Sequence, residues 1–87
     1  MCTLTFAWDI MENLASIFGK GSWEVLKEMH LDIVRVHADT RACDLALGGI
    51  EYRITRTHHR RWHVATTGYW RVFGSQWDLL AWIGDRL

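Results

Sequence analysis

The chain has 87 residues, in which ten Lys and Arg balance ten Asp and Glu. This length leaves room for one small domain with one core, and the zero formal charge argues against a uniformly basic polyanion binder. Hydrophobic residues make up 49% of the chain and charged residues 23%, which excludes an intrinsically disordered protein. We therefore expect a single globular domain over residues 1–87, with six Trp and no Pro in its sequence.

Cysteine usage and the N-terminal sequence bear on the compartment. Cys2 and Cys43 are too few for a disulfide scaffold. Residues 1–9 lack the positive charge that opens a signal peptide, and no apolar run approaches the ~18 residues of a membrane span. We expect a cytoplasmic protein without a membrane partner, in the host cytoplasm if a phage encodes it.

The N-terminal part has helical patterning. Apolar residues follow helical spacing over residues 8–18, and Gly19 ends the pattern. Ser22 is a good N-cap for a second helix. The apolar spacing then continues, but the β-branched run at 33–36 also suits a strand. Residues 31–37 are therefore left open as helix or strand.

A β-hairpin follows around Gly48-Gly49, a dipeptide typical of two-residue hairpin turns. In such a hairpin, residues at equal distances from the turn face each other across the two strands. Apolar or amphipathic side chains then share one face, with the pairs Leu47–Ile50, Leu45–Tyr52 and Cys43–Ile54. The other face pairs Ala46 with Glu51 and Asp44 with Arg53, the second a plausible ion pair.

The same alternation of inward and outward side chains predicts the next strands. Matching Ile54 to Val64 across the next turn requires an odd number of loop residues, and the three residues His58-His59-Arg60 fit. Trp62 and Val64 of a strand over 61–66 then point inward. A second three-residue loop at 67–69 would then direct Trp70 and Val72 inward.

Gly74 ends the predicted sheet, and Ser75 is a suitable N-cap for a final helix. This helix is expected to bury Trp77, Leu80 and Ala81, with Ile83 as a further candidate. The patterns together predict an α+β fold with an N-terminal helical segment, an antiparallel β-meander of three to four strands and a C-terminal helix.

The odd-numbered face of this meander is the predicted binding surface. Residues 52–75 contain five Arg and no acid, whereas residues 1–51 carry a net charge of −4. Arg side chains offer paired donors to phosphate or carboxylate groups. Trp82 is added as an exposed hydrophobic contact for a partner. The candidate residues are Arg53, Arg56, His58, His59, Arg60, Arg61, His63, Tyr69, Arg71 and Trp82. An ordinary solvated sheet face is the alternative interpretation.

No catalytic, metal or cofactor signature is found in the sequence. His59 and His63 have a metal-like spacing, but one is expected in a loop and the other on a strand, and the chain has no Cys-x2-Cys. No paired base and nucleophile can be assembled. We therefore expect a protein that is not an enzyme and needs no cofactor.

Residues 49–80 resemble the three-strand-plus-helix DNA-binding domains of the AP2 and phage-integrase arm type. The resemblance lies in the strand Tyr-Arg-Ile-Thr-Arg, the aromatic strand Arg-Trp-His-Val, a third strand and a helix. In that family the exposed sheet face enters the major groove, which implies contacts from Arg53, Arg61, His63 and Arg71. The resemblance covers about a third of the chain and has no invariant motif.

In size and in its lack of motifs, the chain is also similar to small phage-encoded inhibitors such as anti-CRISPR proteins. Two functions are therefore expected. The first is a non-catalytic inhibitor from a phage or mobile element that binds a larger host protein or ribonucleoprotein complex, for example a CRISPR–Cas complex. The alternative is a DNA- or RNA-binding domain that uses residues 52–75. A homodimer, built on the helical face or on Trp82, is a further expectation.

Overall fold

The structure, a computed structural model, describes residues 12–58 and 60–87 and has an α+β fold. Residues 12–18 are helical, and short 3-10 turns occupy Lys27–Met29 and Ala38–Thr40. The remaining elements are α2 (Lys20–Leu26), β1 (Asp32–His37), β2 (Ala42–Leu47), β3 (Ile50–His58), β4 (Arg61–Thr66), β5 (Tyr69–Phe73) and α3 (Gln76–Arg86). The predicted fold class is confirmed, and the sheet has five strands where three to four were expected.

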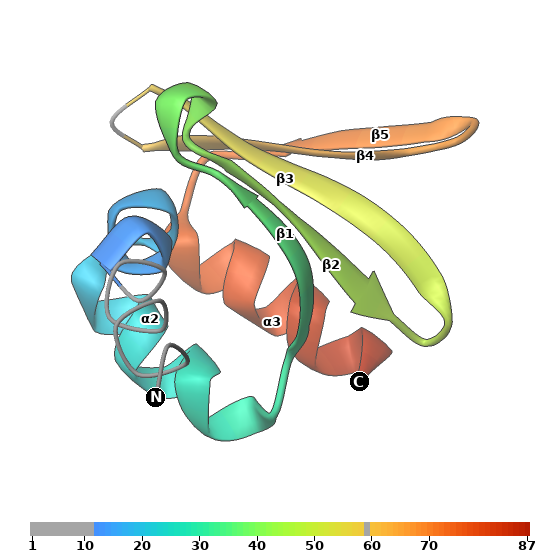
Figure 1. Cartoon of the computed structure of the whole chain (residues 1–87), viewed down its shortest axis with the longest axis horizontal. Helices are drawn as coiled ribbons and strands as arrows, with labels where there is room; N and C mark the ends of the chain where they lie inside the picture. Colours follow the sequence, from blue (N-terminus) through green and yellow to red (C-terminus); the bar gives the residue numbers. More distant parts are fainter. Residues whose placement is uncertain (1–11, 59) are drawn as a thin grey trace.

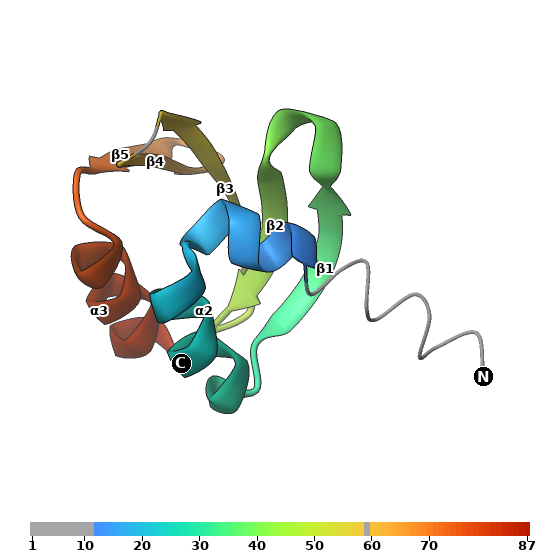
Figure 2. The ribbon, with the colours of Figure 1, turned by 90° about the vertical axis from the view of Figure 1, so that its left-hand side faces the viewer.

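The five strands form one antiparallel sheet in the order β1-β2-β3-β4-β5, so each strand pairs with its neighbours in sequence. The helical residues 12–18, α2 and α3 all lie on the same side of this twisted sheet (Figures 1 and 2). We call the helix-covered side the inner face and the opposite side the outer face.

The core lies between the inner face and the helices. Trp62 of β4 is nearly fully buried, and its indole N–H donates a 2.7 Å hydrogen bond to the Ile17 carbonyl. Trp62 thereby satisfies its own buried polar atom while it joins the sheet to the helical residues 12–18. The buried cluster also includes Phe18, Leu26, Leu45, Leu47, Ile54, Val64, Leu79 and Ile83.

The β2–β3 hairpin confirms the predicted register. Asp44 pairs with Arg53, and Cys43 pairs with Ile54. Gly48 and Gly49 have φ values of +58° and +83°, which L-amino acids with side chains rarely adopt. The Gly-Gly dipeptide therefore fixes both the turn and the face that each following side chain occupies.

The β4–β5 hairpin differs from the prediction by one residue. The turn contains only Thr67 and Gly68, so that Thr66 pairs with Tyr69. A shift of one residue moves every side chain of the strand to the other face. Tyr69, Arg71 and Phe73 consequently lie on the inner face. Trp70 and Val72, expected inside, lie on the outer face with exposed fractions of 74% and 39%.

Helix α3 begins as predicted but presents a different face to the core. The Ser75 hydroxyl accepts a hydrogen bond from the Trp77 backbone N–H at 3.2 Å, which confirms the predicted N-cap. Trp77, expected in the core, is 52% exposed, because the buried positions of α3 are Leu79, Trp82 and Ile83.

Trp82, expected as an exposed contact, is instead buried. Its ring packs edge-on against Tyr52 with centroids 5.1 Å apart, and its N–H donates to the Tyr69 hydroxyl at 3.3 Å. The inward position of Tyr69, which follows from the shorter β4–β5 turn, supplies this hydrogen-bond partner.

The other boundaries also differ in detail. Helix α2 starts at Lys20 with Gly19 as its N-cap, and Ser22 lies inside the helix, where its hydroxyl donates to the Phe18 carbonyl. Residues 32–37 are a strand, which decides the alternative left open by the sequence.

The predicted match of Ile54 with Val64 across β3 and β4 is confirmed. Strand β3 continues to His58 through an irregular register instead of ending before a loop at 58–60. The first residues of the expected helix over 8–18, and His59, lie outside the described residues.

Candidate functional site on the outer sheet face

The outer face is organised in two rows of side chains that cross all five strands. One row contains, from β1 to β5, His37, Ala42, Thr55, His63 and Val72. The next row contains Arg35, Asp44, Arg53, Ala65 and Trp70. Charged and imidazole groups therefore concentrate on β1 to β4, whereas β5 contributes two apolar side chains.

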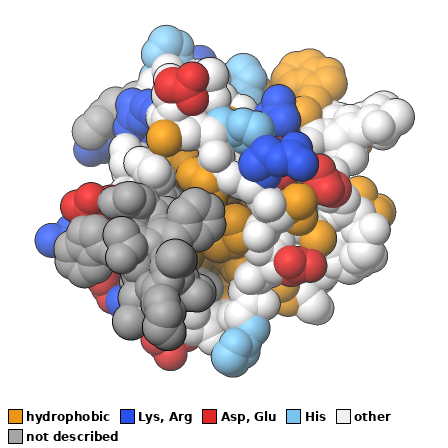
Figure 3. Space-filling view, in the orientation of Figure 1, with side chains coloured by type: hydrophobic (Ala, Val, Ile, Leu, Met, Phe, Trp, Pro, Cys, Tyr) orange, Lys and Arg blue, Asp and Glu red, His pale blue; other side chains and the backbone are white. Residues whose placement is uncertain are grey.

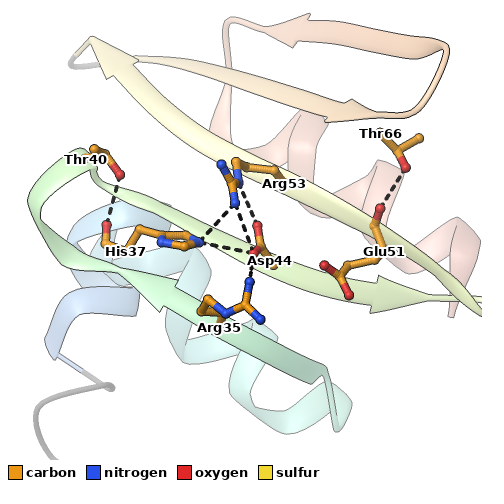
Figure 4. A network of polar contacts seen from close by, with 7 residues as sticks. All are labelled: Arg35, His37, Thr40, Asp44, Glu51, Arg53 and Thr66. Atoms are coloured by element: carbon orange, nitrogen blue, oxygen red, sulfur yellow. Dashed lines mark hydrogen bonds and ion pairs between the residues drawn. The ribbon is translucent and has the colours of Figure 1, made fainter.

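A charge cluster around Asp44 occupies the β1–β3 part of this face (Figure 4). Arg53 Nε lies 2.8 Å from Asp44 Oδ1, and Arg35 Nη1 lies 3.6 Å from Oδ2. His37 Nε2 lies 3.1 Å from the same Oδ2. The Asp44 side chain is only 3% exposed because these three partners, one from β3 and two from β1, cover it.

The surroundings of Asp44 favour its charged form. Hydrogen bonding from Arg53 lowers the pKa of the Asp44 carboxyl, and hydrogen bonding from His37 acts in the same direction. Partial burial opposes this shift without cancelling it. The carboxylate in turn raises the pKa of Arg53. Asp44 thus neutralises part of the positive charge that its partners bring to the outer face.

Trp70 and Val72 form the apolar part of the outer face. Trp70 pairs across the strands with Ala65, whose small side chain leaves the indole uncovered. Figure 3 shows an apolar protrusion close to Lys, Arg and His side chains over the upper part of the molecule. Trp70 shares its row with Arg53, which lies two strands away, and Trp and Arg are among the residues most enriched at interface hot spots.

Further Arg side chains gather where β3 and β4 meet their loop, which we call the basic end: Arg41, Arg56, Arg60 and Arg61. Arg56 Nη1 donates to the Ser16 carbonyl at 2.7 Å, and Arg41 Nη2 donates to the same oxygen at 3.3 Å. Burial and the nearby Arg41 lower the pKa of Arg56. Arg56 and Arg60 also line a groove of about 450 Å³ beside Trp77.

The structure separates the predicted site residues into three groups. Arg53 and His63 lie on the outer face, and Arg61 joins them because it alternates with the buried Trp62. Arg56, His58 and Arg60 lie at or beside the basic end, and His59 lies outside the described residues. Tyr69, Arg71 and Trp82 belong to the inner side, which corrects their expected placement on one surface with Arg53.

Sequence reasoning missed four residues of the outer face: Arg35, His37, Trp70 and Val72. Arg35 and His37 lie two residues apart, so they share one face only if residues 32–37 form a strand. The sequence leaves that assignment open. Trp70 was assigned to the core because its strand is apolar on both faces. The predicted Asp44–Arg53 ion pair is confirmed.

The outer face offers a ligand charge, hydrogen bonds and aromatic surface. Among the described residues, no Ser, Thr or Cys side chain hydrogen-bonds the His37 ring, and no group of three His, Cys, Asp or Glu could hold a metal ion. Burial raises the pKa of the Cys43 thiol to about 12, far from that of a reactive cysteine.

Comparison with known protein families, characterised proteins and solved structures finds no match to this chain. Within the part of the chain that the structure describes, no helix is long and apolar enough to cross a bilayer.

Proposed function

We propose that the protein is a non-catalytic binding module that docks its outer sheet face on a larger protein or ribonucleoprotein assembly. The observation that carries the proposal is the exposure of Trp70, 74%, in the same row as Arg53. Burying an indole at an interface removes ~150–250 Å² from water, and a neighbouring Arg adds directional hydrogen bonds. Trp70 and Val72, 39% exposed, lie on the same face of β5, so the apolar area is larger than that of a single scattered side chain. Contiguous exposed apolar area is what marks interaction surfaces.

The charge pattern favours a protein surface over a generic polyanion. Asp44 already neutralises part of the charge of Arg35 and Arg53, so that the face combines modest positive charge with apolar area. Protein interfaces have this mixed character, whereas interfaces for nucleic acid are more polar and more strongly positive. The size of the chain and its lack of motifs are consistent with a small inhibitor from a phage or mobile element that acts in the host cytoplasm, for example on a CRISPR–Cas complex.

Capture from a bacterial lysate at low salt tests this proposal, with and without nuclease. We expect a nuclease-resistant partner whose capture falls by about 30-fold in Trp70→Ala, because interface hot spots are worth ~2 kcal/mol or more. Trp77→Ala is the matched control, since Trp77 is also exposed but lies at the start of α3. Equal capture by the parent chain and Trp70→Ala, or no capture at all, would contradict the proposal.

The basic end favours a second candidate function, binding of DNA or RNA. Arg41, Arg56, Arg60 and Arg61 lie there, and residues 52–75 contain no acid. The order β3, β4, β5 and α3 also agrees with the strand and helix order of the AP2 and integrase-arm resemblance. Arg71, which that resemblance would place in the groove, lies on the opposite face from Arg53 and His63.

Salt dependence distinguishes this candidate. Binding of a labelled duplex should weaken steeply as salt rises, and the double variant Arg60→Glu/Arg61→Glu should abolish it. Capture that disappears with nuclease in the lysate experiment, while the purified chain binds the duplex, would favour nucleic acid over a protein partner.

A further inference from the structure

The two edges of the sheet are built differently. At one edge, β1 has a register irregularity between Ile33 and Arg35 and carries charged side chains. At the other edge, β5 is regular throughout and reads Tyr-Trp-Arg-Val-Phe. Bulges and charges are the usual means by which proteins prevent a foreign strand from adding to an edge. The β5 edge, with one charged residue, Arg71, and no bulge, is therefore less protected than the β1 edge.

The backbone of β5 has groups available for another strand. In an antiparallel ladder, alternate residues direct both N–H and C=O to the same side. Thr66 and Tyr69 close the two-residue turn, so that Trp70 and Val72 direct their backbone groups away from β4. In the described part of the chain, no strand pairs with this side of β5.

We propose that a second copy of this chain pairs with β5 in antiparallel orientation, around a two-fold axis at Val72. In this register Val72 faces Val72 of the second copy, Trp70 faces Gly74, and Arg71 faces Phe73. Both copies use the same surface, as a closed two-fold dimer requires.

On the outer face, the proposed register matches a large side chain to an open position. Gly74 has no side chain, and a Cβ placed there would meet no atom within 4 Å. Trp70 can therefore lie over Gly74 of the second copy, and the two Val72 side chains meet at the axis. Pairing an aromatic residue with a glycine across strands is a known means of covering the glycine.

On the inner face, the edge carries opposite charges that form no ion pair with each other in the described residues. Arg71 and Asp78 both line a groove of about 470 Å³ between β5 and α3, and neither makes an ion pair in the described residues. Within one copy, the Arg71 guanidinium lies 4.9 Å from the centre of the Phe73 ring. The proposed register places Arg71 opposite Phe73 of the other copy, which lines the same groove as Asp78. The two-fold operation forms this contact twice, so the surface is complementary to itself.

A neighbouring register is less favourable. An axis at Arg71 would place two Arg71 side chains directly opposite each other, and like charges in that position destabilise a sheet. It would also leave Gly74 outside the ladder. The axis at Val72 avoids the repulsion and pairs Gly74 as well.

Cross-linking tests the proposed axis. Residues that face each other in an antiparallel ladder have Cα atoms ~4.5–5.5 Å apart, within the range that a disulfide bridges. The experiment uses the full chain with Val72→Cys in a Cys2→Ser background; Cys43 is buried and remains. Val34→Cys is the matched control, because Val34 lies on the β1 edge and is 43% exposed against 39% for Val72.

We expect Val72→Cys to form a disulfide-linked dimer at least about tenfold faster than Val34→Cys under mild oxidation, because pairing raises the local thiol concentration. Sedimentation of the unmodified chain at about 100 μM should show a dimer, since interfaces of modest size reach micromolar affinity. Val72→Pro, which removes an edge N–H, should sediment as a monomer. Equal cross-linking rates for the two Cys variants, or a strictly monomeric parent chain, would overturn the proposal.

Discussion

The two faces of the sheet bury their side chains by different interactions. On β4, Trp62 points inward and is closed in by the helices, and its N–H is bound to Ile17. On β5, Trp70 points outward and is mostly exposed. The outer face nevertheless contains a buried charged group, the Asp44 carboxylate, held by partners from β1 and β3. Burial on the inner face rests on apolar packing, whereas burial on the outer face rests on charge.

The largest expected effect is at Trp62. Trp62→Ala should lower the free energy of unfolding by about 3–5 kcal/mol, because it removes a large core side chain and leaves the Ile17 carbonyl without its donor. A chain of this length is expected to have only about 4–13 kcal/mol in total, so the loss is a large fraction of its stability and should shift the unfolding midpoint to a clearly lower urea concentration. Urea unfolding followed by circular dichroism measures the difference. Trp62→Phe keeps an apolar ring and should lose less.

An intermediate effect is expected at Asp44. Asp44→Asn should cost about 2 kcal/mol at pH 7, because Arg35 and Arg53 then face each other without the carboxylate between them. Denaturant unfolding at low and high salt measures the cost. Asp39→Asn, on an exposed turn, is the matched control and should change stability by less than about 0.5 kcal/mol.

The pH dependence of this difference identifies its cause. The folded pKa of Asp44 is lowered, so its stabilisation is complete above the unfolded value of about 3.9 and is lost as the pH falls through the folded value. The stability gap between the parent chain and Asp44→Asn should therefore close in acid. A gap that stays constant below pH 3.9 would show that the effect does not arise from charge.

The smallest effect on stability is expected at Trp70. Trp70→Ala should change the free energy of unfolding of the isolated chain by less than about 0.5 kcal/mol, because the indole is mostly in water already. Thermal unfolding at low concentration, where a dimer would dissociate, is the suitable measurement. A loss comparable to that of Trp62→Ala would mean that Trp70 belongs to the core and that the two faces do not differ as described.

The two hairpins show where the sequence pattern determines the strand register and where it does not. In β2–β3, the Gly48-Gly49 turn and the alternation of apolar residues point to the same register, and that register is confirmed. In β5, Tyr, Trp, Val and Phe occupy both faces, so that patterning accepts either register. The length of the Thr67-Gly68 turn then determines which β5 side chains face the core. A strand that is apolar on both faces gives no pattern from which that length could be predicted.

The candidate site was predictable to a similar extent. Arg53 lies on the predicted face because Gly48-Gly49 fixes the register of its strand. Arg61 and His63 lie on the predicted face because the match of Ile54 with Val64 fixes the register of theirs. Arg35 and His37 were missed because β-branched residues beside helical spacing leave the strand assignment open. Trp82 was assigned to the surface because the extent of the buried stripe on α3 depends on the aromatic residues of β3 and β5, which no local pattern reveals.

The order of the strands also has a consequence for how the chain folds. Each strand pairs with the next one in sequence, so most of the sheet can form by closing short loops. The contacts that span the chain join the N-terminal helical residues to the sheet, as between Ile17 and Trp62 or between Ser16 and Arg56. Because closing long loops costs more entropy, we expect the β2–β3–β4 meander to form early and the helical segment to dock on it late.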